Sequence, residues 1–185
     1  PFLYQRAEAK VPSGPAPKTA DGKPDLSGVW FPGPDLEPEV PAFQPWAAAE
    51  AKKRASRPGD DPRALCLPTG VGRMHALDLA KFVQTPSLMV VLVELSVPGV
   101  RQIFLDGRSH PENLQPTWLG HSVGHWEKDT LVVDTIGFND KGWLDGNRPQ
   151  TEQLHVIERY RRLDLGHMEL EITISDEGQG FDPEK

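Results

Sequence analysis

The stretch that decides the fold is GHSVGHWEKDTLVVDT, residues 120–135. Two short runs that contain valine, threonine, leucine and tryptophan flank Lys128-Asp129, which we read as a tight turn. A two-residue loop at this point pairs Val123 with Asp134. Because side chains alternate along a strand, His121 and Asp134 then lie on the same face, diagonally opposed. The stretch therefore predicts a β-hairpin with a histidine and an aspartate within reach of each other.

Further strands are expected on both sides of this hairpin. The segments are short, rich in Val, Ile, Leu and Thr, and bounded by turn residues. They lie at 28–31, 81–84, 88–95, 100–106, 118–127, 130–139, 154–162 and 167–175. Since short connections indicate antiparallel neighbours, we expect a mainly β protein whose roughly eight strands form an antiparallel meander. Such a meander commonly closes into a lipocalin-like barrel; a β-sandwich or an open curled sheet is the alternative.

The distribution of proline predicts how the rest of the chain is organised. Ten of the 19 prolines fall within the first 45 residues. Because proline disfavours helices and central strands, residues 1–44 are expected to form an extended arm that wraps or plugs the barrel. One short helix is expected over 45–57, and the barrel body over 71–176. We expect a single domain over 1–185, with 31–45 shaping any cavity entrance.

Composition narrows the classes of partner. The chain of 185 residues carries a net charge of −7 at pH 7, which argues against nucleic-acid binding. No apolar run is long enough to span a membrane as a helix. The single cysteine, Cys66, excludes an internal disulfide and a cysteine-based zinc cluster, and we expect it to be buried as a small hydrophobe. A small molecule is the partner that we expect, and the oligomeric state stays open.

Two further hairpins are predicted to bring charges together. A turn after Glu94 pairs this residue with Arg101 inside an otherwise apolar set. Pairing Arg159 with Glu169 places Glu158 on the apolar face of its own strand. Because a buried carboxylate is costly unless it is paired, Arg101 is the partner that we expect for Glu158 across the interior.

Candidate catalytic residues follow from the first hairpin. A carboxylate orients an imidazole and raises its basicity, so Asp134 would make His121 a general base near neutral pH. Glu158 is the third catalytic candidate, as an electrostatic partner. The alternatives are a cross-strand hydrogen bond that only fixes the register, and a structural ion pair with Arg101.

Candidate ligand-binding residues combine interior polar groups with large aromatic side chains and one charged rim. Arg108 and His110 follow an Asp-Gly turn signal and would stand at the rim, where an anion could meet a cation. The alternative for the aromatic residues is that they only fill the core. The candidates are Glu94, Arg101, Arg108, His110, Tyr160, Trp118 and Trp126.

No metal site or cofactor is predicted. The chain has six histidines but no HxH, HExxH or CxxC motif. His121 and His125 stand four residues apart, about 13 Å along a strand, so they cannot chelate one ion. A metal site would need His110 or His75 brought in by a loop.

Four runs of the sequence carry a resemblance to a known group. Residues 22–30, 65–70, 101–108 and 120–135 resemble uncharacterised secreted bacterial proteins. The resemblance covers nearly the whole chain and implies export to the periplasm or the medium, since members carry a leader that this chain lacks. Lys128 stands where members often have glycine. The Gly-Val-Trp opening of the first strand is similar to that of lipocalin-like (calycin-type) barrels, which include small-molecule carriers, cyclases and isomerases.

Three functional hypotheses remain, beside a purely structural interaction module. The first is an exported barrel that binds a small molecule in its interior. The second is a metal-independent acid–base enzyme, a hydrolase, lyase or isomerase, with His121 as its base. The third is a metal-dependent enzyme that uses several histidines. Whether the protein is an enzyme is open at this stage, because the fold does not choose among these activities.

Overall fold

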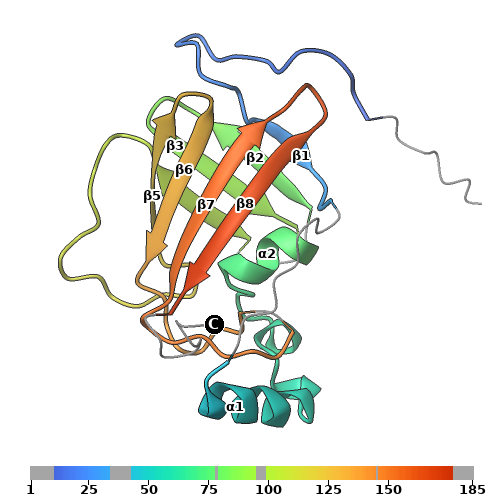
Figure 1. Ribbon diagram of the computed structural model, residues 1–185, viewed down its shortest axis with the longest axis vertical. Helices are drawn as coiled ribbons and strands as arrows, with labels where there is room; N and C mark the ends of the chain where they lie inside the picture. The colour runs from blue at the N-terminus through green and yellow to red at the C-terminus, as the bar shows by residue number, and fades with distance from the viewer. Residues whose placement is uncertain (1–10, 34–42, 78, 95–98, 145, 177–185) are drawn as a thin grey trace, which may run out of the picture.

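The protein is mainly β, as predicted, and its described residues form eight strands in one sheet that curls into a half-barrel (Figure 1). The computed structural model describes residues 11–33, 43–77, 79–94, 99–144 and 146–176. In the sheet the strands stand in their chain order. They are β1 (Gly28–Trp30), β2 (Ala80–Gln84), β3 (Leu88–Val93), β4 (Val100–Phe104), β5 (His121–Glu127), β6 (Thr130–Ile136), β7 (His155–Arg162) and β8 (Met168–Ser175).

The sheet is open rather than closed. Within the described residues, β1 pairs only with β2, and β8 pairs only with β7. The open curled sheet, which the sequence offered as an alternative, therefore fits the structure. The three residues of β1 supply too few backbone groups to extend along the eight-residue β8 and close a barrel.

One junction departs from the predicted antiparallel meander. Strands β4 and β5 run parallel, with Ile103 opposite Ser122 and Phe104 opposite Val123. The segment 105–120 makes the crossover that a parallel pair requires. The expectation of antiparallel neighbours throughout was wrong here, because a tight-connection rule does not apply to a segment of this length.

The register of the 120–135 hairpin is as predicted, since Val123 lies opposite Asp134. In the β7–β8 hairpin Arg159 lies opposite Glu171 and not opposite Glu169, so the prediction was wrong by two residues. A shift of two keeps every side chain on its expected face. The loop 163–167 causes the shift because it is longer than the assumed turn.

The β3–β4 register was also predicted wrongly. Arg101 lies opposite Val91, while Glu94 lies beyond the end of β3 and is exposed. Arg101 points to the concave side of the sheet and Glu94 to the convex side. The expected ion pair between them is therefore replaced by a pair between Arg101 and Glu158.

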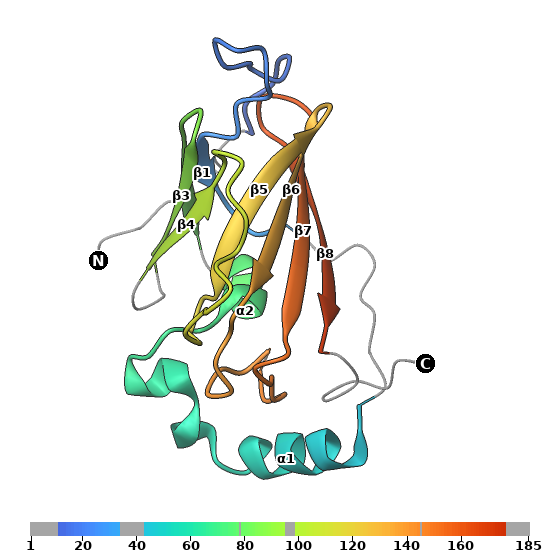
Figure 2. The ribbon, with the colours of Figure 1, turned by 90° about the vertical axis from the view of Figure 1, so that its left-hand side faces the viewer.

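In the described part of the chain, two α-helices lie at the open end of the curl (Figure 2). The first, α1 (Pro45–Ala55), is the helix that the sequence predicts, with proline in its first turn. The second, α2 (Val71–Leu77), was not predicted; its Val71 and Met74 are buried in the core. Short 3₁₀ turns at Pro58–Asp60 and Pro62–Leu65 connect the two. No helix in the described ranges is long and apolar enough to cross a membrane.

Cys66 ends the second 3₁₀ turn in a left-handed conformation, with φ of 57°. Its side chain is exposed, so the expectation of a buried cysteine was wrong. The turn geometry, and not the apolar character of the side chain, decides where this residue lies.

The proline-rich arm contributes to the core on the concave side. Leu26 is fully buried, which is worth about 1.5–3 kcal/mol relative to exposure. Arg162 donates hydrogen bonds to the backbone carbonyls of Asp25 and Ser27, so the arm is fastened to the end of β7. Most of the segment 31–45 lies outside the described residues, and its predicted role at a cavity entrance stays a prediction.

Candidate functional site

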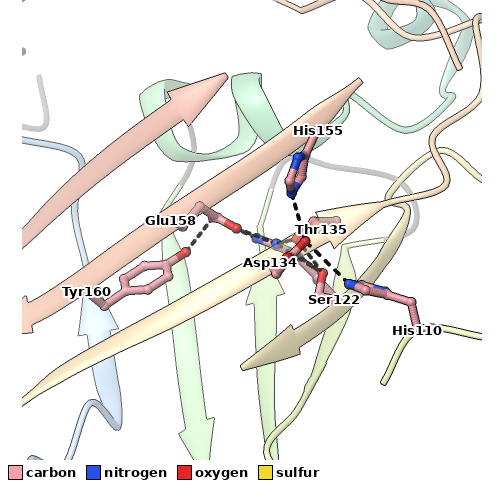
Figure 3. Close-up of polar contacts among 8 residues, drawn as sticks. His110, Ser122, Asp134, Thr135, His155, Glu158 and Tyr160 are labelled. Atoms are coloured by element: carbon pink, nitrogen blue, oxygen red, sulfur yellow. Dashed lines mark hydrogen bonds and ion pairs between the residues drawn. The ribbon is translucent and has the colours of Figure 1, made fainter. Parts of the chain in front are cut away.

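Polar side chains from β4 to β7 and from the segment 105–120 form two clusters, one on each face of the sheet (Figure 3). Because side chains alternate along a strand, neighbouring residues of one strand belong to opposite clusters. The inner cluster lies on the concave face and comprises Arg101, Ser122, Thr135, Glu158 and Tyr160. The outer cluster lies on the convex face and comprises His110, His121, Asp134 and His155.

The inner cluster is a buried ion pair surrounded by hydroxyl groups. Arg101 Nη1 donates to Glu158 Oε1 at 2.8 Å, and Nη2 lies 2.5 Å from Oε2. Only 2% of Arg101 and none of Glu158 is exposed. The same guanidinium donates to Thr135 Oγ1 at 2.9 Å and to Ser122 Oγ at 3.1 Å, while the Tyr160 hydroxyl donates to Glu158 Oε1 at 2.7 Å. The expected partnership of Arg101 and Glu158 therefore forms.

Burial and the neighbouring charges set the ionisation of this cluster. Burial opposes the charge on Arg101, but the Glu158 carboxylate outweighs it and raises the arginine pKa above its usual value. Burial, together with the Glu158 carboxylate, raises the pKa of Tyr160 well above its usual range. The cluster therefore contains a guanidinium, a carboxylate and a neutral phenol. A buried pair of this kind is costly to break but adds little stability over apolar residues of the same shape.

The outer cluster is a row of contacts that runs across three strands. His110 Nδ1 and His121 Nδ1 lie 2.8 Å apart, so one of the two carries the shared proton. His110 Nε2 lies 3.4 Å from Asp134 Oδ1. The same carboxylate oxygen accepts a hydrogen bond from His155 Nε2 at 2.9 Å. His110 therefore stands between His121 and Asp134, where the sequence suggested a direct contact between the two.

Two members of this row come from segments that the first hairpin does not contain. His110 is carried onto the convex face by the crossover segment 105–120. His155 begins β7, where the register pairs Asp134 with Ile157 and so makes His155 the diagonal neighbour of Asp134. Assigning the register of β6 against β7 from the sequence would have placed His155 beside Asp134. The position of His110 depends on the path of a loop, for which the sequence has no comparable signal.

Aromatic and charged neighbours surround His121. Its ring stacks on Phe104 with centroids 5.3 Å apart, and the Arg108 guanidinium lies 3.9 Å from the Phe104 centroid. Arg108 is held by Asp106 at 2.6 Å. Partial burial, then the neighbouring His110 and Arg108, lower the pKa of His121 below 6.5. His121 is therefore neutral at pH 7.

The other predicted ligand-binding residues do not join one site. Glu94 is exposed at an apolar hollow of about 220 Å³ on the convex side of β2 and β3. Trp126 packs partly buried against the core, and Trp118 is half-buried near the end of the crossover. A larger open hollow of about 800 Å³ lies between α1 and residues 149–152. Neither hollow is lined by a residue of the two clusters.

The donor set of the outer cluster does not converge on one point. His110 turns its two ring nitrogens toward different neighbours. Throughout the described part of the chain, no group of three or more His, Cys, Asp or Glu side chains is arranged to hold a metal ion. The fold and these contacts define a half-barrel β protein with a histidine–aspartate cluster on its convex face. Comparison with family models, curated proteins and solved structures finds no match to this chain.

Proposed function

We propose that the protein is an acid–base enzyme of the hydrolase, lyase or isomerase type, with the outer cluster as its proton-transfer site. One observation carries this proposal: the row of contacts from His155 through Asp134 and His110 ends at His121, a half-buried histidine that is neutral at pH 7. A carboxylate that supports an imidazole is a recurring arrangement for moving protons near neutral pH.

The contacts favour one arrangement of the ring protons. His155 donates its Nε2 proton to Asp134, and the arrangement places the proton of His110 on Nε2, 3.4 Å from the same carboxylate oxygen. His110 Nδ1 then accepts the Nδ1 proton of His121. This arrangement leaves a lone pair on Nε2 of His121. That atom is the base in the proposal.

The proposed step is a proton transfer to His121. Its Nε2 atom takes a proton from a bound water or from the substrate, and the electron pair of the broken bond stays on the substrate. The positive charge can then be shared with His110, because the Nδ1 proton lies between the two rings. Asp134 balances this charge. General acid–base assistance of this kind contributes about 10²–10⁴-fold to a rate.

The long contact between His110 and Asp134 fits a site that tightens during the reaction. Nε2 of His110 is buried and makes no hydrogen bond within the described residues. An unsatisfied buried donor is unfavourable, so positive charge on His110 would draw Nε2 toward the carboxylate. Catalytic hydrogen bonds are often long in the absence of substrate.

Arg108 suggests the class of substrate. Its side chain is about half exposed, at 48%, and it acts electrostatically on His121. A small molecule with a carboxylate or another anionic group would place that group near Arg108 and its reacting atom near His121. A ligand in the interior, the other hypothesis, would have to displace the hydrogen bonds of Arg101 and Glu158.

The test compares the unmodified protein with His121→Gln on 4-nitrophenyl acetate, between about pH 5 and about pH 8. The rate of the unmodified protein should rise with pH and level off once His121 is neutral. The His121→Gln variant should lose about tenfold or more. His125→Gln is the matched control, because His125 lies on the same strand and face but is exposed, and its rate should not change. Equal rates for the unmodified protein and His121→Gln would contradict the proposal.

A further inference from the structure

The convex face of strands β1 to β4 exposes several apolar side chains, together with Lys81 and Gln102. Val29 in β1 is 54% exposed, Val83 in β2 is 40%, Leu92 in β3 is 38% and Val100 in β4 is 48%. Phe31, which directly follows β1, is 78% exposed. Single exposed hydrophobes are ordinary on a protein surface, but a contiguous apolar patch indicates an interaction site.

The sheet register makes this patch contiguous. Val29, Lys81, Leu92 and Val100 stand opposite one another in successive strands, so they form one row across the sheet. Val83 and Val90 form the next row, which continues into the exposed Gln102 of β4. The convex face of β5 to β8 is different, because charged residues cover it and are held in ion pairs such as Arg161–Glu169. The apolar character is therefore confined to one half of the sheet.

An apolar hollow of about 220 Å³ lies within this half and has one charge of each sign at its edge. Lys81 and Glu94 both line the hollow and are exposed. No ion pair within the described residues uses either side chain. A surface that holds an apolar patch, one cation and one anion is complementary to a copy of itself, since a two-fold axis can bring each cation to the other copy's anion.

We propose that two copies of the chain associate through the convex face of β1 to β4. Val29, Leu92 and Val100 are buried between the copies. Lys81 of each copy pairs with Glu94 of the other, so the interface contains this ion pair twice. A lipid surface is a poorer occupant, because Glu94 stands in the patch and the chain carries a net charge of −7.

The test is a charge exchange followed by sedimentation velocity from about 1 µM to about 100 µM protein. The unmodified protein should sediment as a dimer at the upper concentrations. Lys81→Glu and Glu94→Lys should each raise the dimer dissociation constant by about tenfold or more, because like charges then meet across the axis. The double variant should restore the unmodified value. Arg161→Glu with Glu169→Arg is the matched control on the other half of the sheet and should have no effect.

Several results would overturn the proposal. A monomer at every concentration would do so. A dimer whose dissociation constant is unchanged by either single charge reversal would also do so. A monomer that floats with phosphatidylglycerol vesicles would assign the face to a lipid surface instead. Circular dichroism of each variant excludes unfolding as the cause, and the exposed positions of Lys81 and Glu94 make folding of the variants the expected result.

Discussion

The inner and outer clusters share the same strands but differ in their access to water. Thr135 belongs to the inner cluster and the adjacent Asp134 to the outer one, so they are neighbours in the chain on opposite faces of β6. Glu158 is not exposed at all, whereas the side chain of Asp134 is 38% exposed. The inner carboxylate is bonded to a guanidinium and a phenol. The outer carboxylate meets two imidazoles, those of His155 and His110.

This difference in burial suggests different roles for the two clusters, one in stability and the other in activity. In the inner cluster, the residues that bond one another are closed off from water and from any substrate. In the outer cluster, the side chains of Asp134 and His155 stay within reach of solvent. We therefore expect damage to the inner cluster to lower stability, and damage to the outer cluster to lower activity.

The largest expected effect is on the inner cluster. Glu158→Ala leaves the Arg101 guanidinium buried without its carboxylate, so the free energy of unfolding should fall by about 3–5 kcal/mol. Urea denaturation measures this loss. Replacing both partners together, Arg101→Met with Glu158→Leu, should recover most of it, because no uncompensated charge remains. A loss below about 1 kcal/mol in the single variant would show that the pair is not buried as described.

The corresponding change in the outer cluster should lower activity more than it lowers stability. Asp134→Asn should lower the free energy of unfolding by less than about 1 kcal/mol, because water reaches this carboxylate. The same variant should hydrolyse 4-nitrophenyl acetate about tenfold more slowly, since the charge that supports His110 is lost. The measurement pairs urea denaturation with initial rates. If Asp134→Asn kept full activity and lost much stability, the assignment of activity to the outer cluster would be wrong.

A smaller effect concerns pH. The pKa of His121 is lowered from 6.5 in the folded protein by burial, with His110 and Arg108 adding to it. Between the lowered pKa and 6.5 the unfolded chain binds more protons, so this residue makes the protein more stable as pH rises through that window. The increment should disappear in His121→Gln and persist in His125→Gln. Urea denaturation at several pH values measures it, and a slope of opposite sign would contradict the lowered pKa.

The smallest effect is expected at the tip of the hairpin that carries both clusters. Lys128 has φ of 57°, a conformation that costs a residue with a side chain about 1–2 kcal/mol. Lys128→Gly removes this strain but adds entropy to the unfolded chain, so a net gain of about 0.5 kcal/mol is expected. Thermal unfolding and ester hydrolysis together check that stability rises while activity is unchanged. A destabilised variant would show that Lys128 makes a contact worth more than its strain.

The sequence predicted the strands well because their signal is local. Alternation and turn residues placed the strands near their observed bounds, and the two-residue turn gave the correct register of β5 against β6. Local signals also put His121 and Asp134 on one face. What they could not supply was the path of long segments. The parallel junction of β4 and β5, and with it the place of His110, depends on a crossover whose course is decided by packing.

Wrongly predicted strand registers account for the other errors at the site. The loop after Arg162 is longer than assumed, which moved one register by two residues and changed no face. The observed register pairs Arg101 with Val91, so Glu94 lies away from Arg101 and on the convex side. The pairing of Arg101 with Glu158 could still be predicted, because a charged residue on an apolar face needs a partner of opposite sign.

The parallel junction also has a consequence for how the molecule folds. β2 to β4 and β5 to β6 form hairpins from nearby residues, and such contacts form early. Arg101 and Glu158 stand 57 positions apart and lie on either side of the junction, so they meet only when the two groups of strands join. If this joining follows the rate-limiting barrier, Glu158→Ala speeds unfolding and leaves the refolding rate nearly unchanged. The buried ion pair then forms after the folding barrier, so it affects the unfolding rate more than the folding rate.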